Sequence, residues 1–173
     1  MKTLILGGVR SGKSCLAETL ASQGRLPVTY VATATAGDVE MRARIEAHRA
    51  CRPRDWTVIE ESILLASVLR AHSGAGCCVI VDCLTLWLTN LLVAADAAVF
   101  ERERDALLAA LPAMPGTVIL VSNETNLGVV PTGELSRRFC DEAGRLHQQL
   151  AQRCDRVLFT VAGLPWVLKG APL

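Results

Sequence analysis

A run of glycines followed by a lysine and a serine has the spacing of a loop that holds phosphate. Residues 7–14 read GGVRSGKS, which fits the pattern G-x-x-x-x-G-K-[ST] between an apolar run and a helical segment. The glycines let the backbone turn its amide groups onto phosphate oxygens, and the following helix points its positive end at the same anion. We expect Lys13 to neutralise β- and γ-phosphate oxygens and Ser14 to bind Mg²⁺, although a glycine turn can match the pattern by accident.

A carboxylate that could complete the magnesium site follows the apolar run Val79-Ile80-Val81. Asp82 ends this run in the way that the metal-binding aspartate of phosphate-loop proteins ends a buried strand. An aspartate that only caps the next turn is the alternative, because Asp favours that place too. The metal-linked interpretation is favoured because the loop at 7–14 calls for a second oxygen ligand.

A histidine among arginines is the third candidate. Residues 38–50 are predicted to form a helix on which Met41, Ile45 and His48 share one face. Arg42, Arg44 and Arg49 lie in this segment, and Arg52 and Arg54 follow it closely. A core histidine beside a solvated basic face would explain this pattern without function. Arginines that clamp a triphosphate would explain it equally, and a neutral imidazole beside them could attack phosphorus.

The elements that must position these residues alternate between strands and helices. Strands are expected at 3–6, 28–34, 56–59, 77–82, 117–122 and 156–161, with a turn at 163–165, and helices at 13–23, 38–50, 63–71, 97–111 and 134–153. This alternation predicts an α/β fold with a mainly parallel sheet flanked by helices, of the P-loop NTPase type. The length of 173 residues suits a single domain over residues 1–173.

The composition excludes several other classes. A formal net charge of +1 gives no general attraction for nucleic acid. The seven cysteines include no C-x-x-C pair, so neither a zinc ribbon nor a redox motif is indicated, and we expect a reducing cytoplasm. The apolar stretch around 84–95 is too short and too polar to span a membrane.

Further segments of specific sequence accompany the phosphate loop GGVRSGKS at 7–14: YVATA at 30–34, the histidine-centred segment from Glu40 to Trp56, VDCLTLWLTNLL at 81–92, VSNE and LGVVP within 121–131, and RFCDEAGRLHQ at 138–148. Together they resemble the family of bifunctional adenosylcobinamide kinases / adenosylcobinamide-phosphate guanylyltransferases of cobalamin assembly. They follow one another through nearly the whole chain. The segments at 81–92 and around His48 are far more specific than the phosphate loop.

The resemblance implies two activities. The enzyme would first phosphorylate the aminopropanol hydroxyl of adenosylcobinamide with ATP or GTP. His48 would then attack the α-phosphorus of GTP, expel pyrophosphate and hold GMP as a guanylyl-histidine, from which the cobinamide phosphate takes GMP to give adenosylcobinamide-GDP. A covalent intermediate divides one displacement between two bulky anions into two easier steps.

The resemblance also implies which residues bind the nucleotide, and that the protein is a homotrimer with sites at subunit borders. The contacts fall on Gly7, Gly8, Val9, Arg10, Ser11, Gly12, Lys13, Ser14, Ala32, Thr33, Ala34, Arg49, Ala50, Cys51, Arg52, Glu60 and Asp82. Lys13 and His48 would be catalytic, and Ser14 and Asp82 would bind Mg²⁺. Two departures from the family pattern concern corrinoid contacts: Thr125-Asn126 replace a more glycine-like loop, and His147 stands where Asn is expected.

Other interpretations stay open at this point. Another small P-loop kinase would use Lys13, Ser14 and Asp82 without a covalent step, and His48 would then be structural. A nucleotide-dependent switch protein is a second alternative, although the guanine-specificity pattern N-K-x-D of G proteins is absent. The stretch 123–133 is either a substrate or subunit contact or an ordinary loop, and His147 has no evident catalytic partner.

Overall fold

The computed structural model describes residues 1–35, 39, 46 and 53–172. The strands are β1 (Lys2–Gly7), β2 (Val28–Ala32), β3 (Thr57–Glu60), β4 (Cys78–Asp82), β5 (Thr117–Asn123), β6 (Arg156–Val161) and β7 (Leu164–Lys169). The helices are α1 (Lys13–Gln23), α3 (Leu65–His72), α4 (Leu84–Leu92), α5 (Ala98–Ala110) and α6 (Glu134–Arg153), with a short 3₁₀ turn, Leu111–Ala113, after α5. The expected helix at 38–50 lies outside the described residues, apart from Val39 and Glu46.

The strands form one sheet in the order β3-β2-β4-β5-β1-β6-β7, and only β7 runs antiparallel to its neighbour. The P-loop-type α/β fold with a mainly parallel sheet is therefore confirmed. Parallel strands bring their carboxyl ends to one edge of the sheet, where ligands bind in folds of this kind. Gly7, Ala32, Glu60 and Asp82, the ends of four strands, all lie at that edge.

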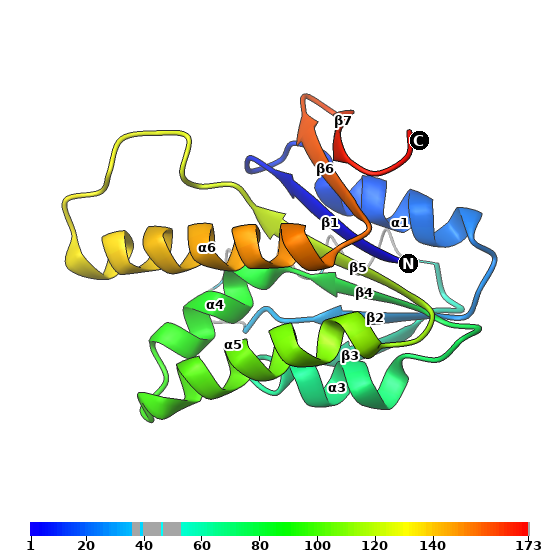
Figure 1. The fold of residues 1–173 in the computed structure, drawn as a ribbon, viewed down its shortest axis with the longest axis horizontal. Helices are drawn as coiled ribbons and strands as arrows, with labels where there is room; N and C mark the ends of the chain where they lie inside the picture. Colours follow the sequence, from blue (N-terminus) through cyan, green and yellow to red (C-terminus); the bar gives the residue numbers. More distant parts are fainter. Residues whose placement is uncertain (36–38, 40–45, 47–52, 173) are drawn as a thin grey trace.

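Helices cover both faces of the sheet within the described residues (Figure 1). On one face α3, α4, α5 and α6 pack against Leu4, Val81 and Leu120. On the other, α1 packs against Ile5, Ile80 and Val121. Because side chains alternate along a strand, the apolar runs of β1, β4 and β5 fill both layers, as expected for strands buried on both sides.

Three expectations differ from the structure. The second strand ends at Ala32 rather than residue 34, because Thr33 turns its side chain to the backbone of Cys83. Residues 84–92 form α4, which was not expected. The turn placed at 163–165 lies at Ala162 and Gly163, whose φ values of +52° and +80° suit a two-residue hairpin turn, so residues 164–169 continue as β7.

Candidate functional site

The phosphate loop joins β1 to α1, and glycine is required at two of its positions. A Cβ on Gly7, whose φ is +153°, would lie 2.4 Å from the carbonyl oxygen of Thr160. Gly12 has φ +98° and directly precedes Lys13, the first residue of α1. A side chain at either position would be strained, so these two glycines fix the path of the loop into the helix. The first amide groups of α1 have no partner within the helix and face this loop.

Neighbouring segments support the loop from two sides. Gly163, in the β6–β7 turn, donates its backbone N–H to the carbonyl oxygen of Ser11 at 2.9 Å. Glu124, just after β5, donates its backbone N–H to the carbonyl oxygen of Gly7, also at 2.9 Å. Gly7 and Ser11 are buried, whereas Gly8, Val9 and Arg10 are exposed at the rim. The predicted phosphate-binding residues therefore form one supported loop at the edge of the sheet.

Lys13 is a buried cation at the mouth of this loop. Its side chain is held back on the loop, where Nζ donates to the carbonyl oxygen of Gly8 at 2.6 Å, and the residue is only 6 % exposed. Burial lowers the pKa of Lys13, and the nearby Asp82 carboxylate partly opposes this effect by raising it. A charge that has lost its water gains more from an anionic ligand than an exposed lysine would.

Asp82 lies at the carboxyl end of β4, and its carboxylate is held by an aromatic residue of the next strand. The hydroxyl of Tyr30 in β2 donates to Asp82 Oδ2 at 2.7 Å. The Tyr30 ring is stacked on Trp56 with the ring centroids 6.4 Å apart. This bond fixes the orientation of one carboxylate oxygen and leaves Oδ1 for other contacts.

The ends of β2 and β4 are tied together at Thr33. Its hydroxyl donates to the carbonyl oxygen of Cys83 at 2.6 Å and accepts the backbone N–H of Cys83 at 2.9 Å. Asn90 of α4 donates to the Thr33 carbonyl oxygen at 2.9 Å. Burial raises the pKa of the Cys83 thiol to about 11, so it stays neutral at physiological pH. These hydrogen bonds set the distance between the ends of β2 and β4, where the half-buried Ala32 and Asp82 lie, with Ala34 just beyond β2.

The oxygen donors here fit a magnesium ion that arrives with a nucleotide. Ser14 offers a hydroxyl and Asp82 a carboxylate, both hard oxygen ligands of the kind that Mg²⁺ takes. Within the part of the chain that the structure describes, no group of three His, Cys, Asp or Glu side chains could hold a metal ion by itself. Two protein ligands leave the remaining positions to phosphate oxygens and water, which is how Mg²⁺ is commonly held in nucleotide enzymes.

Five of the predicted site residues fall outside the described part of the chain: His48, Arg49, Ala50, Cys51 and Arg52. The loop at 7–14, residues 32–34, Glu60 and Asp82 lie along the same edge of the sheet, with Glu60 on the outermost strand, β3. Glu60 is exposed at the end of β3, in register with Ala32.

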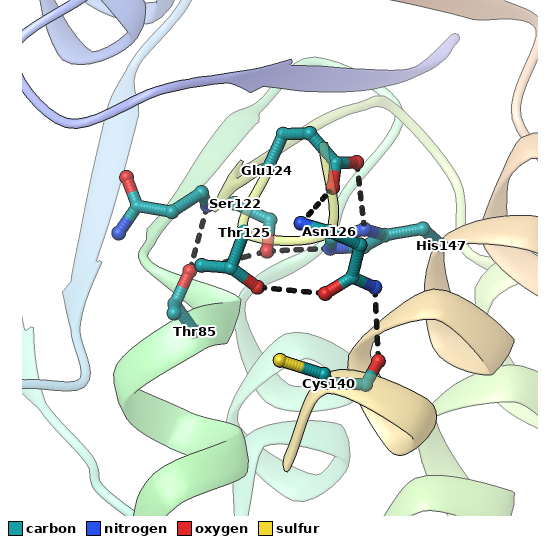
Figure 2. Close-up of polar contacts among 8 residues, drawn as sticks. Thr85, Ser122, Glu124, Thr125, Asn126, Cys140 and His147 are labelled. Carbon is teal, nitrogen blue, oxygen red and sulfur yellow. Dashed lines mark hydrogen bonds and ion pairs between the residues drawn. The ribbon is translucent and has the colours of Figure 1, made fainter. Parts of the chain in front are cut away.

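A cluster of polar side chains that was not predicted from the sequence lies at the end of β5. His147, expected to lack a catalytic partner, is buried on α6 and makes a 2.8 Å hydrogen bond through Nε2 to Ser122 Oγ. Its Nδ1 is 3.7 Å from Glu124 Oε2, and Thr85 of α4 lies on the other side of Ser122 (Figure 2). The signal in the sequence was the polar triplet Ser122-Asn123-Glu124 at the end of an apolar strand.

The strand–loop–helix with its buried lysine, set against an aspartate at the carboxyl edge of a parallel sheet, defines a P-loop nucleotide-binding protein. Comparison with known families then makes the assignment narrower. The chain belongs to the cobinamide kinase / cobinamide phosphate guanyltransferase family, whose model matches residues 3–168.

Curated proteins of cobalamin biosynthesis match this chain over nearly all of their length. The chain is 62 % identical to the bifunctional adenosylcobalamin biosynthesis protein CobP of Pseudomonas aeruginosa, and the match covers 100 % of both chains. It is 38 % identical to the corresponding protein CobU of Escherichia coli, covering 95 % of this chain and 97 % of that one. The CobU protein of Salmonella typhimurium is 39 % identical over the same shares.

Solved structures share the fold at low identity. A Pyrococcus horikoshii protein, PH0250, has a TM-score of 0.55 at 10 % identity, covering 99 % of this chain and 87 % of that one. The RadB recombinase has a TM-score of 0.51 at 18 % identity, covering 91 % and 73 %. These similarities concern the fold alone. None of the described helices is long and apolar enough to cross a bilayer.

Proposed function

We propose that this protein phosphorylates adenosylcobinamide with ATP or GTP and then transfers GMP from GTP to the product, giving adenosylcobinamide-GDP. The observation that carries the proposal is the buried Lys13 in a glycine-shaped loop that faces Asp82 across the carboxyl edge of the sheet. The identity of the acceptor, a cobinamide, is inferred from the family to which the chain belongs. The 62 % identity to a bifunctional relative over the whole chain supports both activities in one polypeptide.

In the phosphorylation step, the loop residues hold and orient the triphosphate. Amide groups of residues 7–14 and the Lys13 ammonium neutralise the β- and γ-phosphates, so that charge developing on the leaving diphosphate is compensated. The acceptor hydroxyl oxygen bonds to the γ-phosphorus and releases its proton to solvent, while the bond from that phosphorus to the bridging oxygen breaks and the diphosphate leaves with the electron pair. Bound through Ser14 and Asp82, Mg²⁺ would supply further neutralisation of phosphate charge.

The second step uses His48 as the nucleophile in this proposal. The imidazole forms a bond to the α-phosphorus of GTP, and the bond to the bridging oxygen of the departing pyrophosphate breaks. The phosphate of cobinamide phosphate then displaces the imidazole and takes GMP. The support is the position of His48 within the family-matched segment and the five arginines around it, whose guanidinium groups suit a triphosphate.

We also propose that the enzyme acts in the cytoplasm as a homotrimer. The cysteines that the structure describes are all free, which suits a reducing compartment. The trimer rests on the family resemblance, and sedimentation of the purified protein tests it.

The test of the function follows both corrinoid products. Purified protein is incubated with adenosylcobinamide, GTP and Mg²⁺, and samples are separated by chromatography and identified by mass. We expect cobinamide phosphate to appear first and adenosylcobinamide-GDP to follow. Consumption of GTP without either corrinoid product would contradict the proposed function, and accumulation of cobinamide phosphate alone would limit it to a kinase.

Replacing Tyr30 by Phe is expected to raise the Mg²⁺ concentration needed for half-maximal phosphorylation by about tenfold, because groups that orient a metal ligand contribute on that scale. The change removes only the hydroxyl that donates to Asp82. Phosphorylation rates measured against Mg²⁺ at saturating nucleotide check this. Nucleotide binding without Mg²⁺ serves as the control and should be unchanged. An unaltered Mg²⁺ dependence would show that this hydrogen bond does not orient a metal ligand.

A further inference from the structure

The carboxyl end of β5 lies between the phosphate loop and Asp82. The sheet order places β5 between β4, which ends at Asp82, and β1, which ends at Gly7. Neighbouring strands are about 4.8 Å apart, so β1 and β4 are separated by about twice that distance. A triphosphate that reaches from the phosphate loop to a metal ion held by Asp82 must therefore pass over the end of β5.

Asn123 is the residue that β5 presents there. It is level with Gly7 in the β1–β5 pairing, whereas Asp82 is level with Val121, so Asn123 stands two residues closer to the open edge. Val121 packs on the α1 side of the sheet. Alternation along the strand directs Asn123 to that same side, where the phosphate loop begins α1.

The side-chain amide of Asn123 is available for a ligand. Asn123 is half-buried, and its amide makes no hydrogen bond to any residue in the described part of the chain. Neither amide atom is among the fully buried polar atoms that lack a partner in that part, so both reach solvent. An amide held at a site edge with its donors unused is suited to bind an anion oxygen.

The backbone of Asn123 is fixed from the α4 and α6 side. Its N–H donates to Thr85 Oγ1 at 2.7 Å. Thr85 Oγ1 is 3.3 Å from Ser122 Oγ, which in turn is 2.8 Å from His147 Nε2 (Figure 2). Burial lowers the pKa of His147, with Glu124 opposing this effect, and a neutral ring can accept a hydrogen bond from the Ser122 hydroxyl. The side chains of Thr85, Ser122 and His147 are thus linked by hydrogen bonds that hold the end of β5 at Asn123.

The residue after Asn123 is fixed as well. Glu124 donates its backbone N–H to Gly7, and its carboxylate accepts the N–H of Asn126 at 2.7 Å. The other carboxylate oxygen lies 3.7 Å from His147 Nδ1, with 15 % of the Glu124 side chain exposed. Because both neighbours of Asn123 are anchored, its position relative to the phosphate loop is set before any ligand binds. Such pre-organisation is what makes a polar contact effective in a transition state.

We propose that the Asn123 amide donates a hydrogen bond to the terminal phosphate of the bound triphosphate, and that Thr85 is a positioning residue that holds Asn123 for this contact. The proposal deepens the proposed function, because the terminal phosphate is the group transferred to the cobinamide hydroxyl. Asn123 would stabilise charge on that phosphate as the acceptor bond forms and the diphosphate leaves with its electron pair. It would contribute less to the attack on the α-phosphorus.

The first test measures binding and does not depend on turnover. Affinities for GDP and for the β,γ-imido analogue of GTP are compared by calorimetry between proteins with and without Asn123→Ala, both carrying His48→Ala, because the analogue keeps the α–β phosphate bond that His48 would cleave. We expect the analogue to bind about tenfold more weakly and GDP to bind as before, because a hydrogen bond to a charged phosphate contributes on that scale. Equal losses for both nucleotides, or no loss for either, would overturn the proposal.

A second variant guards against a folding defect. Asn123→Asp keeps the size of the side chain and places a carboxylate at the terminal phosphate, so it should discriminate against the analogue more strongly than Asn123→Ala. Thermal unfolding of each variant confirms that it is folded. An Asn123→Asp protein that binds the analogue as well as wild type would place this side chain away from the phosphate.

The positioning role of Thr85 is tested with a matched pair. Thr85→Val removes the hydroxyl and should lower kcat for cobinamide phosphorylation about tenfold with little change in KM for nucleotide, whereas Thr85→Ser should restore the rate. Thr89→Val on the same helix removes an exposed hydroxyl that donates to the Thr85 carbonyl oxygen and serves as the control. Equal rates for the Val and Ser variants at position 85 would overturn this part.

If wild-type protein yields no corrinoid product, the proposed function fails, while the two binding tests still decide whether Asn123 meets a terminal phosphate. If product forms but the Asn123 variants bind both nucleotides normally, only the further inference fails. The two conclusions are therefore separable in one set of purified proteins.

Discussion

The Lys13→Ala variant is expected to be slower than wild type in both cobinamide phosphorylation and GMP transfer by about 30- to 1000-fold, which corresponds to ~2–4 kcal/mol of transition-state stabilisation. Lys13 is the first residue of α1 and is 6 % exposed, and burial lowers the pKa of its ammonium group. Removing it takes away a cation that would neutralise the phosphate oxygens of the leaving group. Steady-state rates with saturating and limiting nucleotide, measured for each step, check this.

Two variants separate charge from packing at this position. Lys13→Met keeps most of the buried side-chain volume, so it should be as slow as Lys13→Ala while unfolding at nearly the wild-type temperature. Arg70→Ala removes an exposed cation from α3 and should leave both rates unchanged. A Lys13→Met enzyme that phosphorylates cobinamide at the wild-type rate would contradict the role given to the lysine.

The His48→Ala variant is expected to lose GMP transfer by at least about a thousandfold while it keeps phosphorylating cobinamide, because only the second step needs a covalent nucleophile. With GTP labelled at the α-phosphate, wild-type protein should carry acid-labile, base-stable label, and the variant should carry none. Peptide mapping of the labelled protein identifies the modified residue.

A matched histidine provides the control for this experiment. His72 ends α3 and is exposed, so His72→Ala should take up label as wild type does. Absence of label from wild-type protein would end the covalent mechanism and leave a P-loop kinase. Loss of phosphorylation together with label in His48→Ala would show that the histidine supports the whole site rather than one step.

Sequence patterns predicted the elements that carry local signals. The bounds of α1 and α6 match those expected, and both begin at the residues that follow a glycine. The helix at 84–92 does not stand out in the sequence, because apolar residues occupy most of its positions and hide the period of 3.6. The turn predicted at 163–165 extends two residues into β7, because a proline such as Pro165 is tolerated in an edge strand, and β7 is one.

The site was predictable where one segment provides both the residues and their geometry, as in the phosphate loop. Contacts between segments that are distant in the sequence could not be predicted. The hydrogen bond from Tyr30 to Asp82 joins residues 52 positions apart, and that from His147 to Ser122 joins residues 25 positions apart. Both depend on strand order and helix packing, which no short pattern encodes. The Tyr30 and His147 side chains therefore gain their roles only once the sheet is assembled.

The support that the phosphate loop receives from the β6–β7 turn has a consequence for synthesis of the protein. Ser11 and the segment that leads into α1 emerge from the ribosome early, but Gly163, which bonds to Ser11, is translated much later. A nascent chain that ends before β6 would carry the nucleotide-binding motif without Thr160 or Gly163 beside it. Binding competence is thus deferred until the hairpin is made, so truncated polypeptides would not sequester GTP.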